Sequence, residues 1–349
     1  MTELTKQIPM NSISTKVPEL KTANEMRDNI HTALVTDRPR ISTGILEIDK
    51  MLHGGLVNEL YILGADTSTG KSAFMQSIAE SISKAGTANV LYFAFEMSTL
   101  ELIARGISKV SFEMSMRDPD VKGTKFSDIL HWKYDSVCNI FTKISPEEYK
   151  VAEEEYFEGY GQNIVFIEGG VAGGNVSNIA QIAINYKQQH PEKPVVVFVD
   201  YLQIVRADPD DRSQADRKTK MDIAVLTLKT LASQVGMPVF VASSLSRAGY
   251  QDRVKNSSFK ESGDLEYTGG VLLGLNWCGV SNQKNEDEVK EEKNKCEARG
   301  YRIMALDLLK NRNAARDQSA TLYYYPAYNY YTDVKPEEAI VRKPTVLRL

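Results

Sequence analysis

The segment YILGADTSTGKSAF, residues 61–74, constrains the fold of this chain more than any other stretch. An apolar run that suits a buried strand leads into a loop of small residues, and then Phe74, Ile78 and Ile82 recur at helical spacing. In this order of strand, loop and helix, backbone N–H groups and the helix N-terminus can bind phosphate. The sequence therefore predicts a P-loop, with Lys71 on the β and γ phosphates and Ser72 as a Mg²⁺ ligand.

The P-loop departs from the pattern G-x-x-x-x-G-K-[ST] at one position. Ala65 stands where the first glycine is usual, and Gly64 comes one residue earlier. Alanine is small enough for the turn, and a chance GKS at a helix start would leave the flanking strand and helix unexplained. We predict that the nucleotide is held by the loop residues Ala65, Ser68, Thr69, Gly70, Lys71, Ser72 and Ala73.

Strand-like and helix-like segments alternate from residue 41 onward, which indicates an α/β protein with a mostly parallel sheet and crossover helices. Strands are expected at 59–63, 90–95, 164–167, 195–199 and 239–242, and helices at 71–85, 99–112, 146–157, 176–189 and 216–235. Later strands at 271–277, 302–309 and 321–325 predict an antiparallel extension. Residues 1–40, with a weak helix at 19–34, are interpreted as an arm or linker, and residues 41–349 as one domain.

Two segments in the C-terminal half have unusual compositions. Residues 281–300 are highly charged and show no apolar face, which favours a solvated loop. The tyrosine-rich run YYYPAYNYY, residues 323–331, suits a strand and turn with aromatic packing better than a platform for stacking bases.

Two acidic residues follow apolar runs that suit buried parallel strands. Asp200 ends VVVFVD, and it is predicted to hold Mg²⁺ or its water ligands beside the P-loop. Glu96 follows VLYFAF and could orient or deprotonate the attacking water. Taken alone, Glu96 could equally cap the helix that begins near Ser98.

Composition excludes several other classes of protein. The sequence contains no apolar run of about 18 residues that could span a bilayer, and its first residues lack the apolar core of a signal peptide, so we expect a cytoplasmic protein without membrane contact. Its three cysteines and four histidines show no metal-ligand spacing. The net charge of −4 neither supports nor excludes a DNA partner, because positive charge can be confined to one surface.

Six segments together resemble the DnaB-type replicative helicases, in the order in which that family has them: ADTSTGKS, FAFEMS, VFVDYLQIV, SSLSR, FKESGDLE and LKNRN. The resemblance runs from about residue 41 to about residue 325 and implies a RecA-like P-loop NTPase domain. It implies that Glu96 is the catalytic glutamate. It further implies that Lys310 and Arg312 of LKNRN act in trans on the γ phosphate bound by a neighbouring subunit.

The segment FKESGDLE is similar to the family's loop that lines the central channel. The resemblance implies DNA-phosphate contacts from Lys260 and from the N–H of Gly263, with Glu261 positioning neighbouring basic groups. Read as isolated residues, they would indicate an ordinary surface turn.

The chain also departs from the family. In SSLSR, Ser244 occupies the position where a glutamine usually senses the γ phosphate, whereas Arg247 matches the arginine of that segment. A serine hydroxyl is shorter than a glutamine side chain, so coupling between the ATP state and the DNA loop is expected to differ. The first 40 residues are too short for the family's helical N-terminal domain, which meets the primase.

The resemblance implies an ATP- and Mg²⁺-dependent DNA helicase or single-stranded DNA translocase that acts in replication as a homo-hexameric ring, with replication proteins as further partners. The alternative is a RecA-like ATPase that binds ATP and DNA as a loader, mediator or regulatory subunit without unwinding. A small-molecule kinase would explain the P-loop but leaves FKESG and LKNRN without a role.

Overall fold

The computed structural model describes residues 22–27, 30, 40–130, 134–135, 140–141, 146–170, 174–202, 217–245, 253–262, 268–281, 283, 285–312 and 318–339. Residues 1–39 and 40–349 form two separate units. In the first unit, the backbone N–H groups and side chains of Thr22 and Glu25 hydrogen bond reciprocally, as at a helix start. Most of the helix expected at 19–34 lies outside the described residues.

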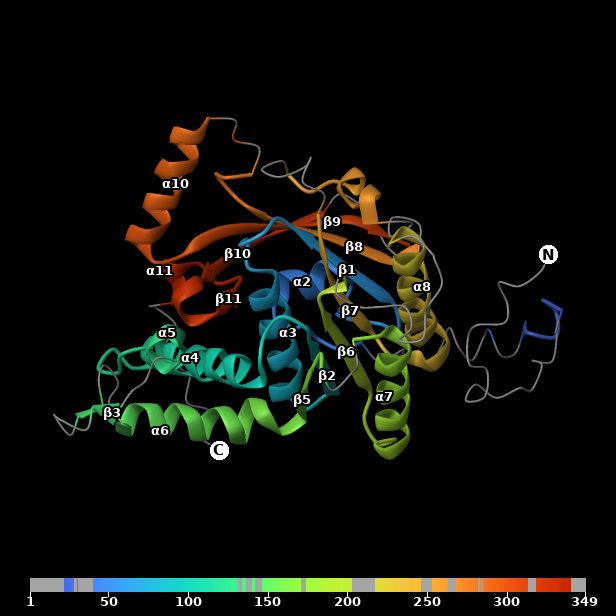
Figure 1. Cartoon of the computed structure of the whole chain (residues 1–349), viewed down its shortest axis with the longest axis horizontal. Helices are drawn as coiled ribbons and strands as arrows, with labels where there is room; N and C mark the ends of the chain where they lie inside the picture. Colours follow the sequence, from blue (N-terminus) through green and yellow to red (C-terminus); the bar gives the residue numbers. More distant parts are fainter. Residues whose placement is uncertain are drawn as a thin grey trace. The chain divides into compact units, whose positions relative to one another are not determined.

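The second unit is built around one central sheet (Figure 1). In the described residues its strand order is β11-β10-β9-β8-β1-β7-β6-β2-β5. The strands from β8 to β5 run parallel, and β9, β10 and β11 extend the sheet antiparallel. The bounds are β1 Leu60–Ala65, β2 Asn89–Ala94, β5 Ile164–Glu168, β6 Val195–Asp200, β7 Val239–Ser244, β8 Val271–Trp277, β9 Arg302–Asn311, β10 Gln318–Tyr325 and β11 Tyr330–Thr332. The predicted α/β fold with a mostly parallel sheet is confirmed.

Helices cover both faces of the sheet because alternate residues of each buried strand point to opposite sides. Tyr61 and Leu63 of β1 pack with α2 (Leu46–Met51) and α3 (Lys71–Ala85). Leu60 and Ile62 pack on the other face with α7 (Val176–Gln189) and α8 (Arg217–Thr230). The continuous apolar strand sequences follow from this two-sided burial.

A third apolar cluster joins α4 (Thr99–Arg117) to α6 (Pro146–Glu155) and to the π-helical turn η1 (Tyr156–Tyr160) that continues it. The predicted helices 71–85 and 176–189 have the bounds found in α3 and α7. Helix α4 extends five residues beyond the predicted end at 112. The predicted helix 216–235 divides into α8 and a π-helical turn η4 (Leu231–Gly236). Further short described elements are α5 (Phe126–Leu130), η2 (Gly161–Asn163), α11 (Pro336–Ala339) and the paired β3 (Tyr134–Asp135) and β4 (Ile140–Phe141).

The solvated loop predicted at 281–300 is wrong, because most of this segment forms α10 (Glu286–Arg299). Caps at its two ends help to stabilise this helix in place of an apolar face. The Asn285 side chain accepts a hydrogen bond from the Asp287 N–H at 3.0 Å, and Gly300 closes the helix in a left-handed conformation. Acidic residues fill the first turn, and Lys295 pairs with Glu291 at 2.6 Å one turn earlier.

The tyrosine-rich run forms the predicted strand and turn. The end of β10 leads through the short 3₁₀ turn η7 (Pro326–Tyr328) into β11. Tyr324 and Tyr331 are buried and stack with ring centroids 4.2 Å apart. Aromatic packing across neighbouring strands therefore explains this composition.

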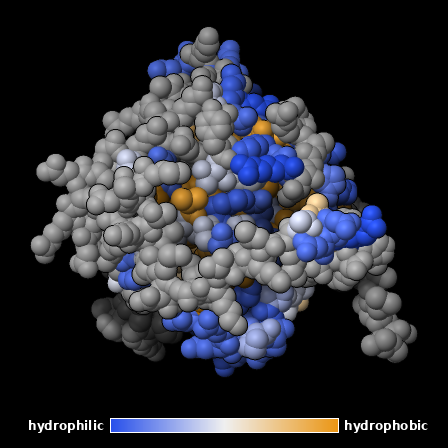
Figure 2. Space-filling view, turned by 90° about the vertical axis from the view of Figure 1, so that its right-hand side faces the viewer, coloured by the Kyte–Doolittle hydropathy of each residue, from blue (hydrophilic) through white to orange (hydrophobic). Residues whose placement is uncertain are grey.

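The face of the molecule drawn in Figure 2 is covered mainly by hydrophilic side chains where it is coloured, and apolar colour is confined to small areas. Among the described residues, no helix combines the length and apolar character needed to cross a membrane.

Candidate nucleotide-binding and catalytic site

The candidate site lies where parallel strands end at one edge of the sheet. Ala65 at the end of β1 is paired with Ser244 at the end of β7. At the end of β6, Asp200 is paired with Ala94, the last residue of β2, and Glu96 follows two residues later. The fold therefore brings the P-loop, both predicted acids and Ser244 to the same edge, as expected for a ligand site in an open α/β sheet.

The P-loop has the backbone conformation that a phosphate-binding turn needs. Gly70 lies at φ +104° and Ser68 at φ +60°, so the chain turns sharply before α3 begins at Lys71. The Lys71 ammonium donates to the Ala65 carbonyl at 3.0 Å. Lys71 is therefore held over the loop, close to where phosphate groups would bind.

The shifted glycine of the P-loop has a packing explanation. A Cβ on Gly64 would lie 2.4 Å from Cζ of Phe259 and 2.9 Å from Cδ2 of Leu245. Phe259 is fully buried and belongs to η6 (Asn256–Ser262), the segment that includes FKES. Gly64 therefore makes room for an aromatic ring from the predicted DNA loop, directly before the phosphate loop.

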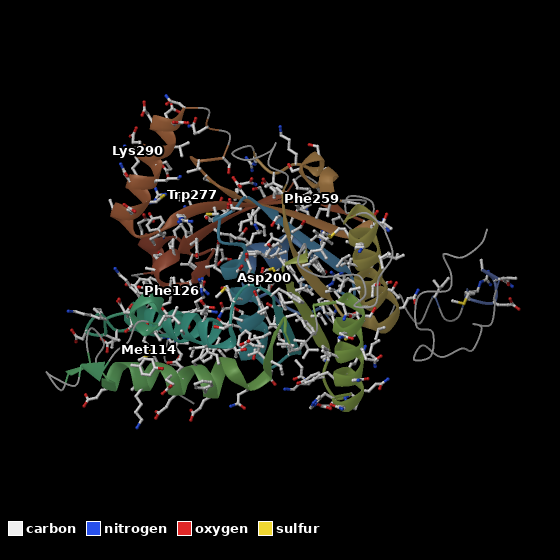
Figure 3. All side chains as sticks on the ribbon, viewed as in Figure 1. Met114, Phe126, Asp200, Phe259, Trp277 and Lys290 are labelled. Atoms are coloured by element: carbon white, nitrogen blue, oxygen red, sulfur yellow. The ribbon has the colours of Figure 1, made fainter. Side chains whose placement is uncertain are left out.

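Asp200 is buried, with 3% of its surface exposed, and it is labelled near the centre of the fold in Figure 3. Burial raises the pKa of its carboxyl group. Hydrogen bonds from Ser72 and from Tyr92, whose hydroxyl lies at 3.1 Å, oppose this rise, as do the charges of Lys71 and Arg105. A hydroxyl and a carboxylate placed side by side are oxygen ligands of the kind that Mg²⁺ takes, so Ser72 and Asp200 fit this ion.

The charges around Lys71 place a second acid near the P-loop. Burial lowers the pKa of the Lys71 ammonium, while the charges of Asp200, Asp66 and Glu96 oppose that shift. Glu96 is exposed at the site edge. It is not needed as a cap, because Ser98 and Glu101 form a reciprocal capping box at the start of α4, with distances of 3.2 and 2.8 Å.

Several residues next to the site were not identified from the sequence. Arg105 on α4 acts electrostatically on Asp200, and its Nη1 donates to Oδ1 of Asn329 at 3.2 Å. Arg302 donates to the Ser68 carbonyl of the P-loop at 3.0 Å and lies 4.0 Å over the Trp277 ring. Neither arginine lies within a local motif. Arg105 comes six residues after Thr99, the first residue of α4, so it lies in the second turn of the helix that follows Glu96, and this position was the available signal.

Lys310 and Arg312 lie at the opposite edge of the sheet. Lys310 on β9 is paired with Leu272 near the start of β8, and the Arg312 N–H donates to the Gly270 carbonyl at 3.2 Å. The Gly270 N–H in turn donates to the carbonyl of Leu60, the first residue of β1. The P-loop follows the other end of β1. The structure therefore does not bring this basic pair to its own P-loop.

The segment that leads into the predicted DNA loop is fixed to the sheet. Arg253 binds both carboxylate oxygens of Asp307 on β9, at 2.6 and 2.7 Å. The Val254 N–H donates to Oδ1 of Asn276 on β8 at 2.8 Å. The backbone of Lys260 and Glu261 belongs to η6, but their side chains, together with Gly263 and Arg247, lie outside the described residues.

Comparison with known proteins gives one family over most of the chain. The family described as "DnaB-like helicase C terminal domain" matches residues 40–333. "Replicative DNA helicase DnaB" of Geobacillus stearothermophilus is 26% identical over 252 residues, which cover 71% of this chain and 49% of that protein. "Replicative DNA helicase DnaC" of Bacillus subtilis (strain 168) is 24% identical over 298 residues, which cover 84% of this chain and 57% of that protein. The chain spans about half the length of the curated relatives it matches.

Solved structures agree on the fold. One of them, described as an ATPase domain, superposes with a TM-score of 0.70 at 20% identity, covering 91% of this chain and all of the other. "The Structure Of A DnaB-Like Replicative Helicase And Its Interactions With Primase" gives a TM-score of 0.68 at 20% identity, covering 89% of this chain and 68% of the other. The RecA-like fold expected from the sequence is thus confirmed, and the chain belongs to the DnaB-like helicase C-terminal domain family.

Proposed function

We propose that this chain is the ATPase motor of a replicative DNA helicase, which hydrolyses ATP with Mg²⁺ at the boundaries of a homo-hexameric ring and moves along single-stranded DNA. The supporting observation concerns the two ends of β1. The P-loop follows its carboxyl end, whereas Lys310 and Arg312 lie near its amino end. The family match agrees with this function.

In the proposed mechanism, the P-loop and the start of α3 bind the triphosphate, and the Lys71 ammonium contacts the β and γ phosphates. Ser72 and Asp200 would hold Mg²⁺, which neutralises charge that develops on the phosphates. Glu96, exposed at the same edge, orients the attacking water and accepts its proton. Ser244 at the end of β7 and Arg247 are proposed to sense the γ phosphate.

The basic pair is proposed to act on a neighbouring subunit's nucleotide. With six residues at about 3.3 Å each, β1 separates its two ends by about 17 Å, which is longer than any side chain. Lys310 and Arg312, near the start of this strand, cannot reach the phosphates bound beyond its end. A cation supplied across a subunit boundary would stabilise the charge that develops during hydrolysis.

The DNA contacts proposed for Lys260 and for the N–H of Gly263 need only phosphate groups and no base recognition. Glu261 is proposed to position neighbouring basic groups. Because phosphate contacts release counterions, the affinity for single-stranded DNA should fall steeply with salt.

The test replaces the arginine that would act in trans. We expect the wild-type ATPase to be stimulated by single-stranded DNA. Arg312→Ala should bind ATP normally but lose hydrolysis by about 10³-fold, because the developing charge loses its cation. Lys290→Ala, which removes a cation on α10, is the matched control and should leave hydrolysis unchanged.

Strand displacement on a forked substrate separates the motor from a loader or regulatory subunit, for which no unwinding is expected. Equal ATPase rates with and without DNA over a range of oligonucleotide lengths would contradict the proposed function.

A further inference from the structure

An ion pair between Glu59 and Lys229 lies beside the residues proposed to act in trans. We propose that this pair positions Lys310 and Arg312, so that Glu59 and Lys229 of one subunit support ATP hydrolysis in the next. This inference rests on the proposed function, because it needs the basic pair to act across a subunit boundary. Glu59 and Lys229 are positioning residues and are not proposed to touch the nucleotide.

The pair is largely shielded from solvent. Only 12% of the Glu59 side chain and 18% of the Lys229 side chain are exposed, and Oε1 of Glu59 contacts the Lys229 ammonium. The same oxygen accepts a hydrogen bond from the Leu60 N–H at 2.9 Å. Glu59 therefore joins the start of β1 to helix α8, which carries Lys229.

Backbone contacts connect Glu59 to the basic pair. The Glu59 side chain packs against Gly270, where a Cβ would lie 2.0 Å from the Glu59 Cδ atom. The Gly270 carbonyl accepts the hydrogen bond from the Arg312 N–H at 3.2 Å. Gly270 thus lies between the Glu59 carboxylate and the backbone of Arg312.

The pairing of β8 with β9 is irregular at the same place. Leu272 pairs with Lys310, but Leu273 pairs with Leu308, so Leu309 is an extra residue in β9. Such a bulge bends a strand and redirects the side chains next to it. Lys310 lies directly beside this bulge, and Glu59 packs against Gly270 at the start of the neighbouring strand.

The charges explain why an acid is needed at this position. The pKa of the Lys229 ammonium is lowered by burial and, further, by the positive charges of Arg312 and Lys310. Three cations therefore gather near one end of the sheet. The Glu59 carboxylate offsets their mutual repulsion, and without it the basic pair would be driven away from Lys229.

The test mixes variants within one ring. Glu59→Gln keeps the size of the side chain and an oxygen acceptor for the Leu60 N–H, but it removes the charge. We expect Glu59→Gln to bind ATP normally and to lose hydrolysis at least 10-fold. Lys71→Ala has a defective P-loop and an intact basic pair, so it should also be inactive alone. In an equal mixture, about a quarter of the boundaries should join an intact P-loop to an intact basic pair.

We therefore expect the mixture of Glu59→Gln with Lys71→Ala to hydrolyse ATP several-fold faster than the sum of the two separate variants. A defect confined to the fold of the Glu59→Gln subunit would not be repaired by a neighbour. Lys229→Met should be complemented by Lys71→Ala in the same way, which provides a second reading if Glu59→Gln fails to fold. Glu47→Gln, at an exposed ion pair with Lys50, is the matched control and should retain wild-type activity.

A parallel mixture of Arg312→Ala with Lys71→Ala tests the trans arrangement itself. If this mixture regains activity and the mixtures with Glu59→Gln and Lys229→Met do not, the positioning role is wrong and the proposed function stands. If Glu59→Gln alone keeps wild-type hydrolysis, the positioning role is also wrong. If the Arg312→Ala mixture stays inactive, the basic pair does not act in trans, and both proposals are overturned.

Discussion

Gly64 links the predicted DNA loop to the P-loop by direct contact. In the sequence it appears only as a glycine one position too early for the phosphate-binding pattern. In the structure, its missing side chain leaves space for the buried ring of Phe259 and for Leu245, which follows Ser244 at the end of β7. Ala65 can take the place of the usual glycine because its backbone does not adopt a positive φ.

We predict that Gly64→Ala destabilises the protein by about 1–3 kcal/mol, because its Cβ would overlap Phe259. Phe259→Leu removes the end of the ring. In the double variant the loss should therefore be smaller than the sum of the two single losses, by about 0.5 kcal/mol or more. Urea unfolding of the four proteins measures this coupling.

The control for this cycle is Gly159→Ala, where a Cβ would meet no atom within 4 Å, so its stability should be unchanged or higher by up to about 1 kcal/mol. Strictly additive losses for Gly64→Ala and Phe259→Leu would show that the two residues do not interact.

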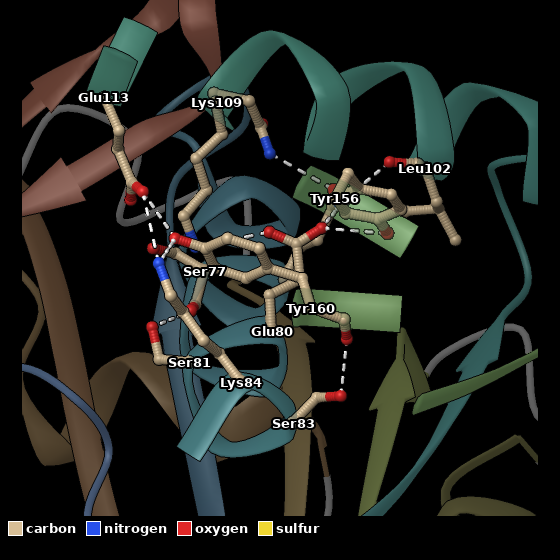
Figure 4. A network of polar contacts seen from close by, with 12 residues as sticks. Ser77, Glu80, Ser81, Ser83, Lys84, Leu102, Lys109, Glu113, Tyr156 and Tyr160 are labelled. Carbon is tan, nitrogen blue, oxygen red and sulfur yellow. Dashed lines mark hydrogen bonds and ion pairs between the residues drawn. The ribbon is translucent and has the colours of Figure 1, made fainter. Parts of the chain in front are cut away.

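At the scale of elements, a buried polar network joins α3 to α4 and to η1 (Figure 4). Glu80 on α3 is fully buried and lies 3.3 Å from the Lys109 ammonium of α4. Gln76 donates to Glu80 at 2.8 Å and to the Leu102 carbonyl of α4 at 2.6 Å. Because α3 begins at Lys71 and α4 begins three residues after Glu96, this network holds the phosphate-binding helix against the helix that follows the proposed base.

The pKa of Glu80 makes the stability of this network depend on pH. Burial raises this pKa, and the charge of Glu113 adds to the rise, while Lys109 and Gln76 oppose it. Tyr156 also faces the carboxyl group, with its hydroxyl 3.4 Å from Oε1. The folded chain therefore holds the Glu80 proton more tightly than the unfolded chain does. Its contribution to stability is greatest below the unfolded pKa of about 4.3 and falls as the pH rises through the folded pKa.

We predict that Glu80→Gln removes this part of the fall in stability with rising pH, whereas Lys109→Met steepens it. At pH 7, Lys109→Met should cost about 3–5 kcal/mol, because it leaves a buried carboxylate without its cation. Urea unfolding between about pH 4.5 and 7 provides the measurement. A Glu80→Gln variant with an unchanged pH profile would contradict the assignment. Lys150→Met, at an exposed pair with Glu154, is the control.

At the scale of the whole molecule, β1 connects two different predicted interfaces. Its carboxyl end leads into the P-loop, and its amino end adjoins Glu59, Lys310 and Arg312. One subunit therefore presents half of a proposed catalytic site at each edge of its sheet. With head-to-tail contacts of this kind, every half-site meets its partner only in a closed ring.

We predict that a non-hydrolysable ATP analogue together with single-stranded DNA assembles the 39.1 kDa chain into a closed oligomer, because the nucleotide is proposed to bind between subunits and the DNA in the channel that they would enclose. Native mass spectrometry or sedimentation measures its mass. A strictly monomeric wild-type protein, with the analogue alone and with DNA added, would remove the in-trans role of Lys310 and Arg312.

The sequence by itself determined the elements whose signals are local. Helices α3 and α7 were predicted with their observed bounds, and in α3 the signal was the helical spacing of Phe74, Ile78 and Ile82. The apolar runs identified the buried strands, and the P-loop and Asp200 followed from their places at strand ends. The roles of Glu96, Lys310 and Arg312 came from the family resemblance and remain predictions.

Only the tertiary structure decided which distant residues meet. Strand order placed Lys310 and Arg312 at the edge opposite the P-loop and brought Gly270 beside Glu59, and the packing of α8 against the sheet added Lys229. It also placed Phe259 against Gly64. Helix α10 was missed because caps and ion pairs stabilise it without an apolar face. The physical reason is common to these cases: hydrophobic periodicity reports which side of an element is buried, whereas contacts between elements depend on strand pairing between residues far apart in the chain.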